Sequence, residues 1–247
     1  MASEDRGTRD DGAPTPPTGA AHGLHAPATA LAIDVFSDVV CPWCYIGERR
    51  LARGLDLARV RHPGLQLDIR WRPYQLRADM PAEGEPWATF MRQKFGGEER
   101  ARAMFAEVAG IGAAEGLTFR FDRVASSPNT VDAHRLILIA AAAGREWAMA
   151  DALFRAYFAE GADLNDQEQL VDVAVRAGLS AADAREHLAG DDGKAEVVRS
   201  QLSAGRLGIQ GVPFYVVDGR LGVSGAQPSE LFARVVEQAL EGSRRSS

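Results

Sequence analysis

The strand-like segments of this sequence lie in two groups at opposite ends of a mostly helical chain. Alternating apolar and polar residues, or short β-rich runs beside turn residues, predict strands over 31–36, 65–71, 213–217 and 220–224. The segment between the two groups carries helical patterns, broken by loops that contain Pro and Gly. One predicted helix begins at Ser127-Pro128, a capping residue before a proline, and runs to about Ala143, and another covers 146–160. The order is therefore strand–helix–strand, a long helical block, and strand–turn–strand–helix. This order predicts an α/β fold with a large helical insertion between the second and third strands.

The composition is that of a globular protein and excludes several classes. The 247 residues are 46% hydrophobic and 25% charged. No apolar run approaches the roughly 18–20 residues that a membrane helix needs. The net charge of −6 argues against a nucleic-acid-binding surface, because neutralising phosphates requires clustered Lys and Arg. Two cysteines are too few for a disulfide-stapled secreted scaffold.

The first 29 residues differ in composition from the rest of the chain. They hold almost no strongly apolar side chains and are rich in Gly, Pro, Ala and charged residues. Such a segment cannot bury enough surface to offset its chain entropy, so we expect a disordered tail over 1–29. It also lacks the continuous apolar segment of an export signal. We therefore expect a cytoplasmic protein.

Both cysteines stand three positions apart in Cys41-Pro42-Trp43-Cys44, where a predicted strand leads into a predicted helix. With Cys41 at the helix cap and Pro42 at the first helical position, free backbone N–H groups would favour a Cys41 thiolate. Cys44 lies about one turn further on and can close a small disulfide ring. The spacing predicts a redox pair in which Cys41 attacks and Cys44 resolves.

Other interpretations of these residues are less favoured. Half of a zinc site would need two more ligands, and His134 and His187 do not have the spacing of a second ligand pair, so we expect no metal. Two inert core cysteines would leave the Pro-Trp between them unexplained. Pro213 is the first residue of the third predicted strand. At that position a proline, which has no N–H group, does not interrupt the hydrogen bonds between strands. From the residues alone, the Val212–Pro213 bond is expected to be trans.

Together the motifs resemble the thioredoxin superfamily, and within it the DsbA family and its FrnE-like members. The resemblance implies a thioredoxin-like domain made of residues 30–73 and 208–242, interrupted by an all-helical insertion over 74–207. It also implies that the Val212–Pro213 bond is cis and packs against the cysteine pair. The matching stretches are 38–47, 71–76, 94–96, 127–130, 134–136, 211–214 and 225–228.

The chain departs from the thioredoxin pattern six residues before the first active cysteine, where thioredoxins commonly carry a buried acid and this chain has Val35. Asp38 and Glu48 are nearby acids that could handle protons, although helix capping or a surface role is the simpler expectation for each. The resemblance places Asn129 and His134 at a helix start that faces the site. There His134 could lend a proton or a hydrogen bond; the alternative is a structural histidine on the helix face.

The resemblance implies a thiol–disulfide oxidoreductase that works through a mixed disulfide. Trp43, Val212, Pro213, His134 and Asn129 are expected to bind the substrate, a protein or small-molecule thiol or disulfide. Trp43, Tyr45 and Phe214 around the motif could form an apolar binding surface. No cofactor is expected beyond the cysteine pair, with glutathione as a candidate co-substrate and a homodimer as a candidate assembly. Two rivals stay open. One is a glutathione-dependent enzyme similar to 2-hydroxychromene-2-carboxylate isomerase or kappa-class glutathione transferase, which usually carry Ser in place of Cys41. The other is a non-catalytic redox-sensing module.

Overall fold

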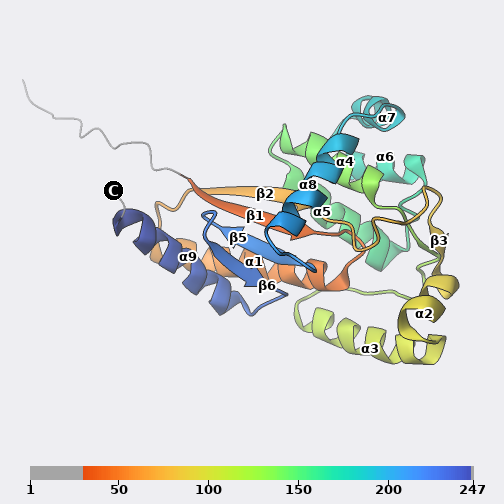
Figure 1. Cartoon of the computed structure of the whole chain (residues 1–247), viewed down its shortest axis with the longest axis horizontal. Coiled ribbons are helices and arrows are strands. Elements are labelled where there is room, and N and C mark those ends of the chain that lie inside the picture. Colours follow the sequence, from red (N-terminus) through yellow and green to blue (C-terminus); the bar gives the residue numbers. More distant parts are fainter. Residues whose placement is uncertain (1–29, 246–247) are drawn as a thin grey trace, which may run out of the picture.

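The main sheet combines strands from both ends of the chain. The computed structural model describes residues 30–245, so the expected disordered tail over 1–29 lies outside the described residues. The sheet has the order β2-β1-β5-β6 (Figure 1). Its central strand β1 pairs parallel with β2 and antiparallel with β5. The strands are β1 (Leu31–Ser37), β2 (Leu67–Pro73), β5 (Phe214–Val217) and β6 (Leu221–Ser224).

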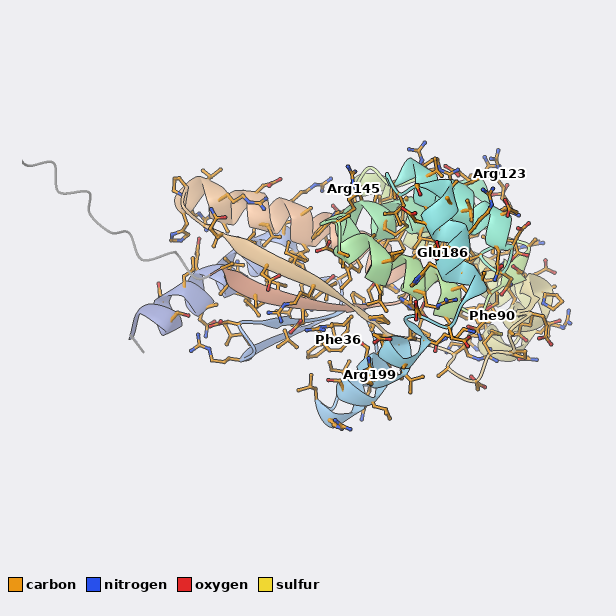
Figure 2. The ribbon with its side chains drawn as sticks, turned by 90° about the horizontal axis from the view of Figure 1, so that it is seen from above. Phe36, Phe90, Arg123, Arg145, Glu186 and Arg199 are labelled. Atoms are coloured by element: carbon orange, nitrogen blue, oxygen red, sulfur yellow. The ribbon has the colours of Figure 1, made fainter. Side chains whose placement is uncertain are left out.

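Alternation along β1 directs its side chains to two different helical layers. Ile33 and Val35 are buried in the main core, together with residues of α1 (Pro42–Arg61) and α9 (Ser229–Arg245). These two helices lie side by side on that face (Figure 1). Phe36 points the other way and packs in a small separate core with Ala204 of α8 (Lys194–Arg206). Figure 2 shows Phe36 close to this helix, which carries Arg199. Both faces of the strand are therefore covered.

The predicted insertion between the second and third strands of the sheet is confirmed, and it is mainly helical. The sheet together with α1 and α9, called the sheet unit below, is itself tightly packed. A Cβ on Gly54 of α1 would lie 2.6 Å from Phe232 Cβ of α9. The insertion contains α2 (Trp87–Phe95), α3 (Glu98–Ala114), α4 (Val131–Ala141), α5 (Glu146–Arg155), α6 (Gln167–Arg176), α7 (Ala181–Ala189) and α8.

The start of α4 differs from the prediction. A helix beginning at Ser127-Pro128 is wrong, since the helix begins at Val131 with Thr130 at its cap. Ser126–Ser127 instead forms a short strand, β4, which pairs with β3 (Glu85–Pro86). The Asn129 side chain then accepts a hydrogen bond from the Val131 N–H at 3.0 Å. That bond satisfies one of the free N–H groups at the helix start and fixes the later beginning.

One hydrophobic core runs through the sheet unit and the insertion. Tyr45 of α1 stacks on Phe154 of α5, with ring centroids 4.9 Å apart. Trp71 of β2 meets Trp147 of α5 edge to face at 5.9 Å. The last turn of the helix predicted over 146–160 is a π-helix, Ala156–Glu160. Within the described chain, no helix has the length and apolar character required to cross a membrane.

Candidate active site

Cys41 stands at the point where the chain leaves β1 and enters α1. It is the N-cap residue, with extended backbone angles (φ −94°, ψ 111°), and Pro42 follows at the first helical position, as the sequence predicts. The Cys41 N–H donates to the Asp38 carbonyl at 3.0 Å, which closes the preceding turn. The Cys44 N–H donates to the Cys41 carbonyl at 3.0 Å, and the Cys41 side chain accepts no capping hydrogen bond. The N–H of Cys44 is thus engaged by the backbone and not by the Cys41 sulfur.

The two thiols are unpaired and occupy different environments. Both are buried, but only Cys41 lines the cavity described below. Burial raises the pKa of the Cys44 thiol well above its ordinary value, and the neighbouring Cys41 thiol raises it further. Cys44 is therefore protonated at neutral pH in the reduced protein, which suits a second-acting thiol.

The loop before β5 reaches the cysteine pair from the far end of the chain. The Val212–Pro213 peptide bond is cis, as the resemblance implies and contrary to the expectation from the residues alone. The Cys41 thiol donates to the Val212 carbonyl at 3.7 Å, a distance suited to sulfur. The Pro213 carbonyl in turn accepts from the Gly225 N–H at 2.8 Å, which ties the loop to the end of β6. The structure thus brings Val212, the residue before the cis proline, to the Cys41 thiol.

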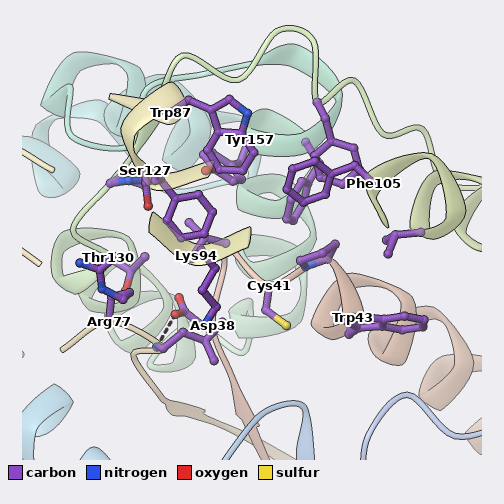
Figure 3. A pocket seen from close by; sticks show the side chains of 18 of the residues that line it. Asp38, Cys41, Trp43, Arg77, Trp87, Lys94, Phe105, Ser127, Thr130 and Tyr157 are labelled. Atoms are coloured by element: carbon purple, nitrogen blue, oxygen red, sulfur yellow. Dashed lines mark hydrogen bonds between the residues drawn. The ribbon is translucent and has the colours of Figure 1, made fainter. Parts of the chain in front are cut away.

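A cavity of about 290 Å³ opens beside Cys41 (Figure 3). Asp38, Val40, the start of α1 and Val212 of the loop before β5 line one part of the cavity, and the insertion contributes the remaining walls. Trp43 is 39% exposed, and Leu76 and Met104 are each 45% exposed. All three line the cavity, which gives it an apolar rim. The aromatic residues of the lining are Trp43, Trp87, Phe90, Phe95, Phe105, Phe121, Tyr157 and Phe158.

Asp38 is a buried acid in the wall of this cavity, so the expected capping or surface role is wrong. Its Oδ2 accepts a hydrogen bond from the Leu76 N–H at 2.8 Å. Its Oδ1 has no hydrogen-bond partner among the described residues and lies 3.5 Å from His134 Nε2. The same His134 nitrogen is 3.1 Å from the Tyr74 carbonyl. His134 does not line the cavity, so it meets the site only through Asp38.

Asn129 and the predicted aromatic surface lie partly outside the site. The Asn129 amide donates to the Met80 carbonyl at 2.7 Å and does not line the cavity. Tyr45 is buried against Phe154, away from any binding surface. Phe214 packs against the small core around Phe36. Of the three aromatic residues expected around the motif, only Trp43 lines the cavity. The aromatic wall from α2 and α3 was not predicted as part of the site, because its rings have ordinary core spacing in the sequence.

Glu48 lies on α1 one turn beyond Cys44, and the capping or surface role expected for it is also wrong. The carboxyl group is buried, and neither oxygen has a hydrogen-bond partner of normal geometry in the described structure. Burial raises the pKa of Glu48 to about 7, although Arg49 lies 3.5 Å away and lowers it, as does the indole of Trp147. The hydroxyl of Tyr215, equally buried and unpartnered, lies against the same helix beside Gly47. This helix therefore carries a poorly solvated acid one turn beyond Cys44.

Comparisons with known proteins agree with this geometry. The chain is similar to a probable DsbA oxidoreductase from Streptomyces coelicolor, with 36% identity, 85% of this chain and 90% of that chain covered, and a TM-score of 0.77. The cytosolic disulfide reductase DsbM from Pseudomonas aeruginosa, solved with GSH, is 21% identical. The match covers 85% of this chain and 100% of that chain, with a TM-score of 0.63. A 2-hydroxychromene-2-carboxylate isomerase is 17% identical, with 87% of this chain and 97% of that chain covered and a TM-score of 0.60. The latter two likenesses concern the fold alone.

A search among curated proteins gives no match. Among the described residues, no group of three or more His, Cys, Asp or Glu side chains is placed to hold a metal ion. The family model of the DSBA-like thioredoxin domain matches residues 32–237, which span the sheet, the cysteine pair and the whole insertion. The chain therefore belongs to the DSBA-like thioredoxin domain family.

Proposed function

We propose that this protein catalyses thiol–disulfide exchange with Cys41 and Cys44 as its redox pair. One observation carries the proposal: two unpaired thiols share the start of α1, and one of them faces a cavity while the other is buried behind it. A non-catalytic sensor would not need a substrate-sized cavity at the first thiol. The Cys-x-x-Cys spacing also separates this site from relatives that carry Ser at the first position.

In the reducing direction, the Cys41 thiolate attacks one sulfur of a substrate disulfide. A bond forms between that sulfur and Cys41 Sγ, and the other substrate sulfur leaves as a thiolate that takes up a proton. Cys44 then loses its proton and attacks Cys41 Sγ, which releases the second substrate thiolate. Two electrons pass to the substrate, and the protein is left with a Cys41–Cys44 disulfide. The oxidising direction runs through the same steps in reverse.

The order of the two attacks follows from the raised pKa of Cys44. Only the thiolate is a nucleophile, so a protonated Cys44 does not attack the substrate while Cys41 is a free thiol. When Cys41 enters the mixed disulfide, its contribution to the raised pKa of Cys44 is lost. Burial, the largest cause of the raised pKa, remains, so the first step only eases the deprotonation of Cys44.

The surrounding residues have supporting roles in this proposal. Trp43 and the Val212–Pro213 loop lie where a substrate sulfur must approach Cys41. We assign His134 as a positioning residue that holds Asp38, and we assign no substrate contact to Asn129. The reaction needs no cofactor beyond the two cysteines, and a thiol such as glutathione would re-reduce them. Work as a reductase suits the cytoplasm, where thiol pools keep cysteines reduced. Membership of the FrnE-like group and a homodimeric state belong to the same proposal.

Single-turnover exchange tests the function. The reduced protein is mixed with oxidised insulin or another disulfide, and the products are followed by mass spectrometry. Cys41→Ser should abolish exchange, whereas Cys44→Ser should stop at a mixed disulfide on Cys41. A mixed disulfide found on Cys44 in the Cys41→Ser variant, at the wild-type rate, would contradict the assignment. Steady turnover with glutathione would exclude a sensor that only switches once.

A further inference from the structure

The cavity beside Cys41 has the size of a small-molecule site with mostly apolar walls. Its volume of about 290 Å³ is close to the lower end of the roughly 300–1,000 Å³ usual for such sites. Besides the aromatic residues named above, its lining includes Val40, Leu76, Met104 and Val108. Walls of this kind favour the apolar part of a ligand, because binding removes apolar surface from water.

Two cationic side chains interrupt these apolar walls, Arg77 and Lys94. Lys94 is exposed on α2 and has no ion-pair partner among the described residues. Arg77 donates to Glu85 at 3.0 Å and to Asp79 at 3.3 Å, but its Nη2 nitrogen makes no hydrogen bond within the described chain. The cavity therefore offers N–H donors on two positive groups to whatever enters it.

Two hydroxyl groups on buried residues lie on the same side of the cavity as Arg77 (Figure 3). Ser127 is 5% exposed and Thr130 is 3% exposed. Neither hydroxyl has a hydrogen-bond partner in the part of the chain that the structure describes, although Thr130 is the N-cap residue of α4. A buried polar group without a partner is unfavourable unless a ligand or water supplies one. The N-terminal end of a helix also favours negative charge, so this side of the cavity suits an anion.

Asp38 is the acid in the lining, and its carboxyl group is occupied by other parts of the protein. Its Oδ2 accepts from the Leu76 N–H at 2.8 Å, and its buried Oδ1 lies 3.5 Å from His134 Nε2. Lys94 and Arg77 have no such contact with this carboxyl group. Their donors are thus left for a ligand, and hydrogen bonds from a cation to a carboxylate are among the strongest in proteins.

We propose that the substrates of this site are small thiols and disulfides in which an apolar chain separates the sulfur from a carboxylate. The sulfur would lie at Cys41 Sγ and the chain along the apolar walls. The carboxylate would accept hydrogen bonds from Arg77, Lys94 and the Thr130 hydroxyl. This inference rests on the proposed function and names its substrate class. The rival substrate, an acidic peptide, is an outcome of the test below.

The test uses dihydrolipoate, a dithiol with a hydrocarbon chain that ends in a carboxylate, and the oxidised protein. One thiolate of the probe attacks Cys41 Sγ, and Cys44 leaves as a thiolate that takes up a proton. The second probe thiol loses its proton and attacks the probe sulfur of the mixed disulfide, which closes the cyclic disulfide and releases Cys41. Two electrons pass from the probe to the protein, and the two thiol protons of the probe balance those of the reduced cysteines. One turnover needs no other reductant.

Dihydrolipoamide is the matched probe, because it has the same dithiol and an uncharged amide in place of the carboxylate. Single-turnover rates are measured by acid quenching and mass spectrometry. We expect dihydrolipoate to react about tenfold faster at low ionic strength, the size of effect that hydrogen bonds to a charged group produce. The preference should shrink as salt is added, because Lys94 is exposed and its charge is screened.

Lys94→Gln and Thr130→Val remove one donor each and should lower the preference for dihydrolipoate to about threefold or less, with little change in the dihydrolipoamide rate. The matched control is Arg92→Gln, which removes an exposed cation of α2 that does not line the cavity. The control should keep the full preference. Lys94 is exposed, so its variant tests the proposal even where Thr130→Val disturbs the start of α4.

Equal rates for the two probes, or an equal loss of preference in Lys94→Gln and Arg92→Gln, would overturn the inference. A Glu-rich peptide dithiol that reacts faster than dihydrolipoate would assign the cations to a polypeptide and would overturn the small-substrate class. In each case the proposed function would stand as long as Cys41→Ser abolishes exchange with insulin. Exchange with insulin that survives Cys41→Ser would defeat the function itself.

A binding measurement gives a readout that is independent of redox chemistry. In the Cys41→Ser/Cys44→Ser double variant, calorimetry with octanoate should show one site, and octanamide should bind more weakly. S-methylglutathione, which has carboxylates but no apolar chain, should also bind more weakly than octanoate. Equal affinity for octanoate and octanamide would overturn the role of the cations. Tighter binding of S-methylglutathione would overturn the apolar chain.

Discussion

Cys41 and Cys44 differ in environment although only two residues separate them. Cys41 lines the cavity, whereas burial raises the pKa of Cys44. At pH 7 iodoacetamide should therefore label the single thiol of Cys44→Ser faster than the single thiol of Cys41→Ser, because Cys41 lines the cavity whereas burial raises the pKa of Cys44 and lowers its thiolate fraction. Mass spectrometry of timed samples measures both rates. Equal labelling of the two variants would contradict the assigned roles.

Glu48 should make the stability of the protein depend on pH. Its folded pKa of about 7 lies above the ordinary 4.5, so the folded chain binds its proton more tightly than the unfolded chain does. Stability from this group is complete at low pH and falls as pH rises from about 4.5 to 7. Glu48→Gln should therefore stabilise the protein at pH 8 by on the order of 2–3 kcal/mol, with little effect below the ordinary pKa.

Urea unfolding of both proteins at several pH values measures that difference. Asp56→Asn is the control, since Asp56 is exposed on the same helix and its variant should show no such pH dependence. A gain in Glu48→Gln that is constant from pH 4 to pH 8 would point to packing and not to ionisation.

At this scale the sequence predicts the reactive pair well and its surroundings poorly. Cys41, Cys44 and Trp43 are recognisable because their spacing alone has a chemical consequence. The burial of Asp38 and Glu48 is not recognisable, since a lone acid near a helix start usually has a surface or capping role. The aromatic residues that line the cavity have the spacing of ordinary core residues, and only the tertiary fold brings them to the same cavity as Cys41.

At the scale of elements, α1 approaches β5 more closely than a side chain would allow. A Cβ on Gly47 would lie 2.3 Å from Tyr215 Oη and 3.0 Å from Pro213 Cγ. Gly→Ala inside a helix normally stabilises by about 1 kcal/mol, but overpacking costs roughly 1–3 kcal/mol. We expect Gly47→Ala to destabilise the protein by about 1–2 kcal/mol, measured by urea unfolding.

Tyr215→Phe supplies the matched background, because it removes only a buried hydroxyl that has no partner in the described structure. In that background Gly47→Ala should lose most of its cost. A cost that is the same in both backgrounds would place the strain elsewhere, for example at Pro213.

The elements themselves follow largely from periodicity, and the errors have local causes. The predicted strands and most predicted helices are present. The β3–β4 pair escapes prediction because two-residue strands have no period. The start of α4 is misplaced because Ser127-Pro128 has the composition of a helix start, whereas backbone pairing with Glu85 holds Ser127 in a strand.

At the scale of the whole molecule, the shared core predicts one cooperative unfolding transition. The stacking of Tyr45 on Phe154 and the contact of Trp71 with Trp147 cross the boundary between the sheet unit and the insertion. Urea transitions followed by tryptophan fluorescence and by far-UV circular dichroism should coincide. Tyr45→Ala should shift both together, by roughly 3–5 kcal/mol for a buried aromatic side chain. Two separate midpoints would show that the insertion unfolds independently.

The contact between the Cys41 thiol and the Val212 carbonyl also has a consequence during synthesis. The two residues are 171 positions apart in the chain. At about 5–20 residues per second, a ribosome needs roughly ten to thirty seconds to add that many residues. Throughout that interval the nascent chain carries the Cys41 thiol without the carbonyl that it contacts in the folded protein. This contact therefore cannot limit the reactions of Cys41 until the last part of the chain has been made.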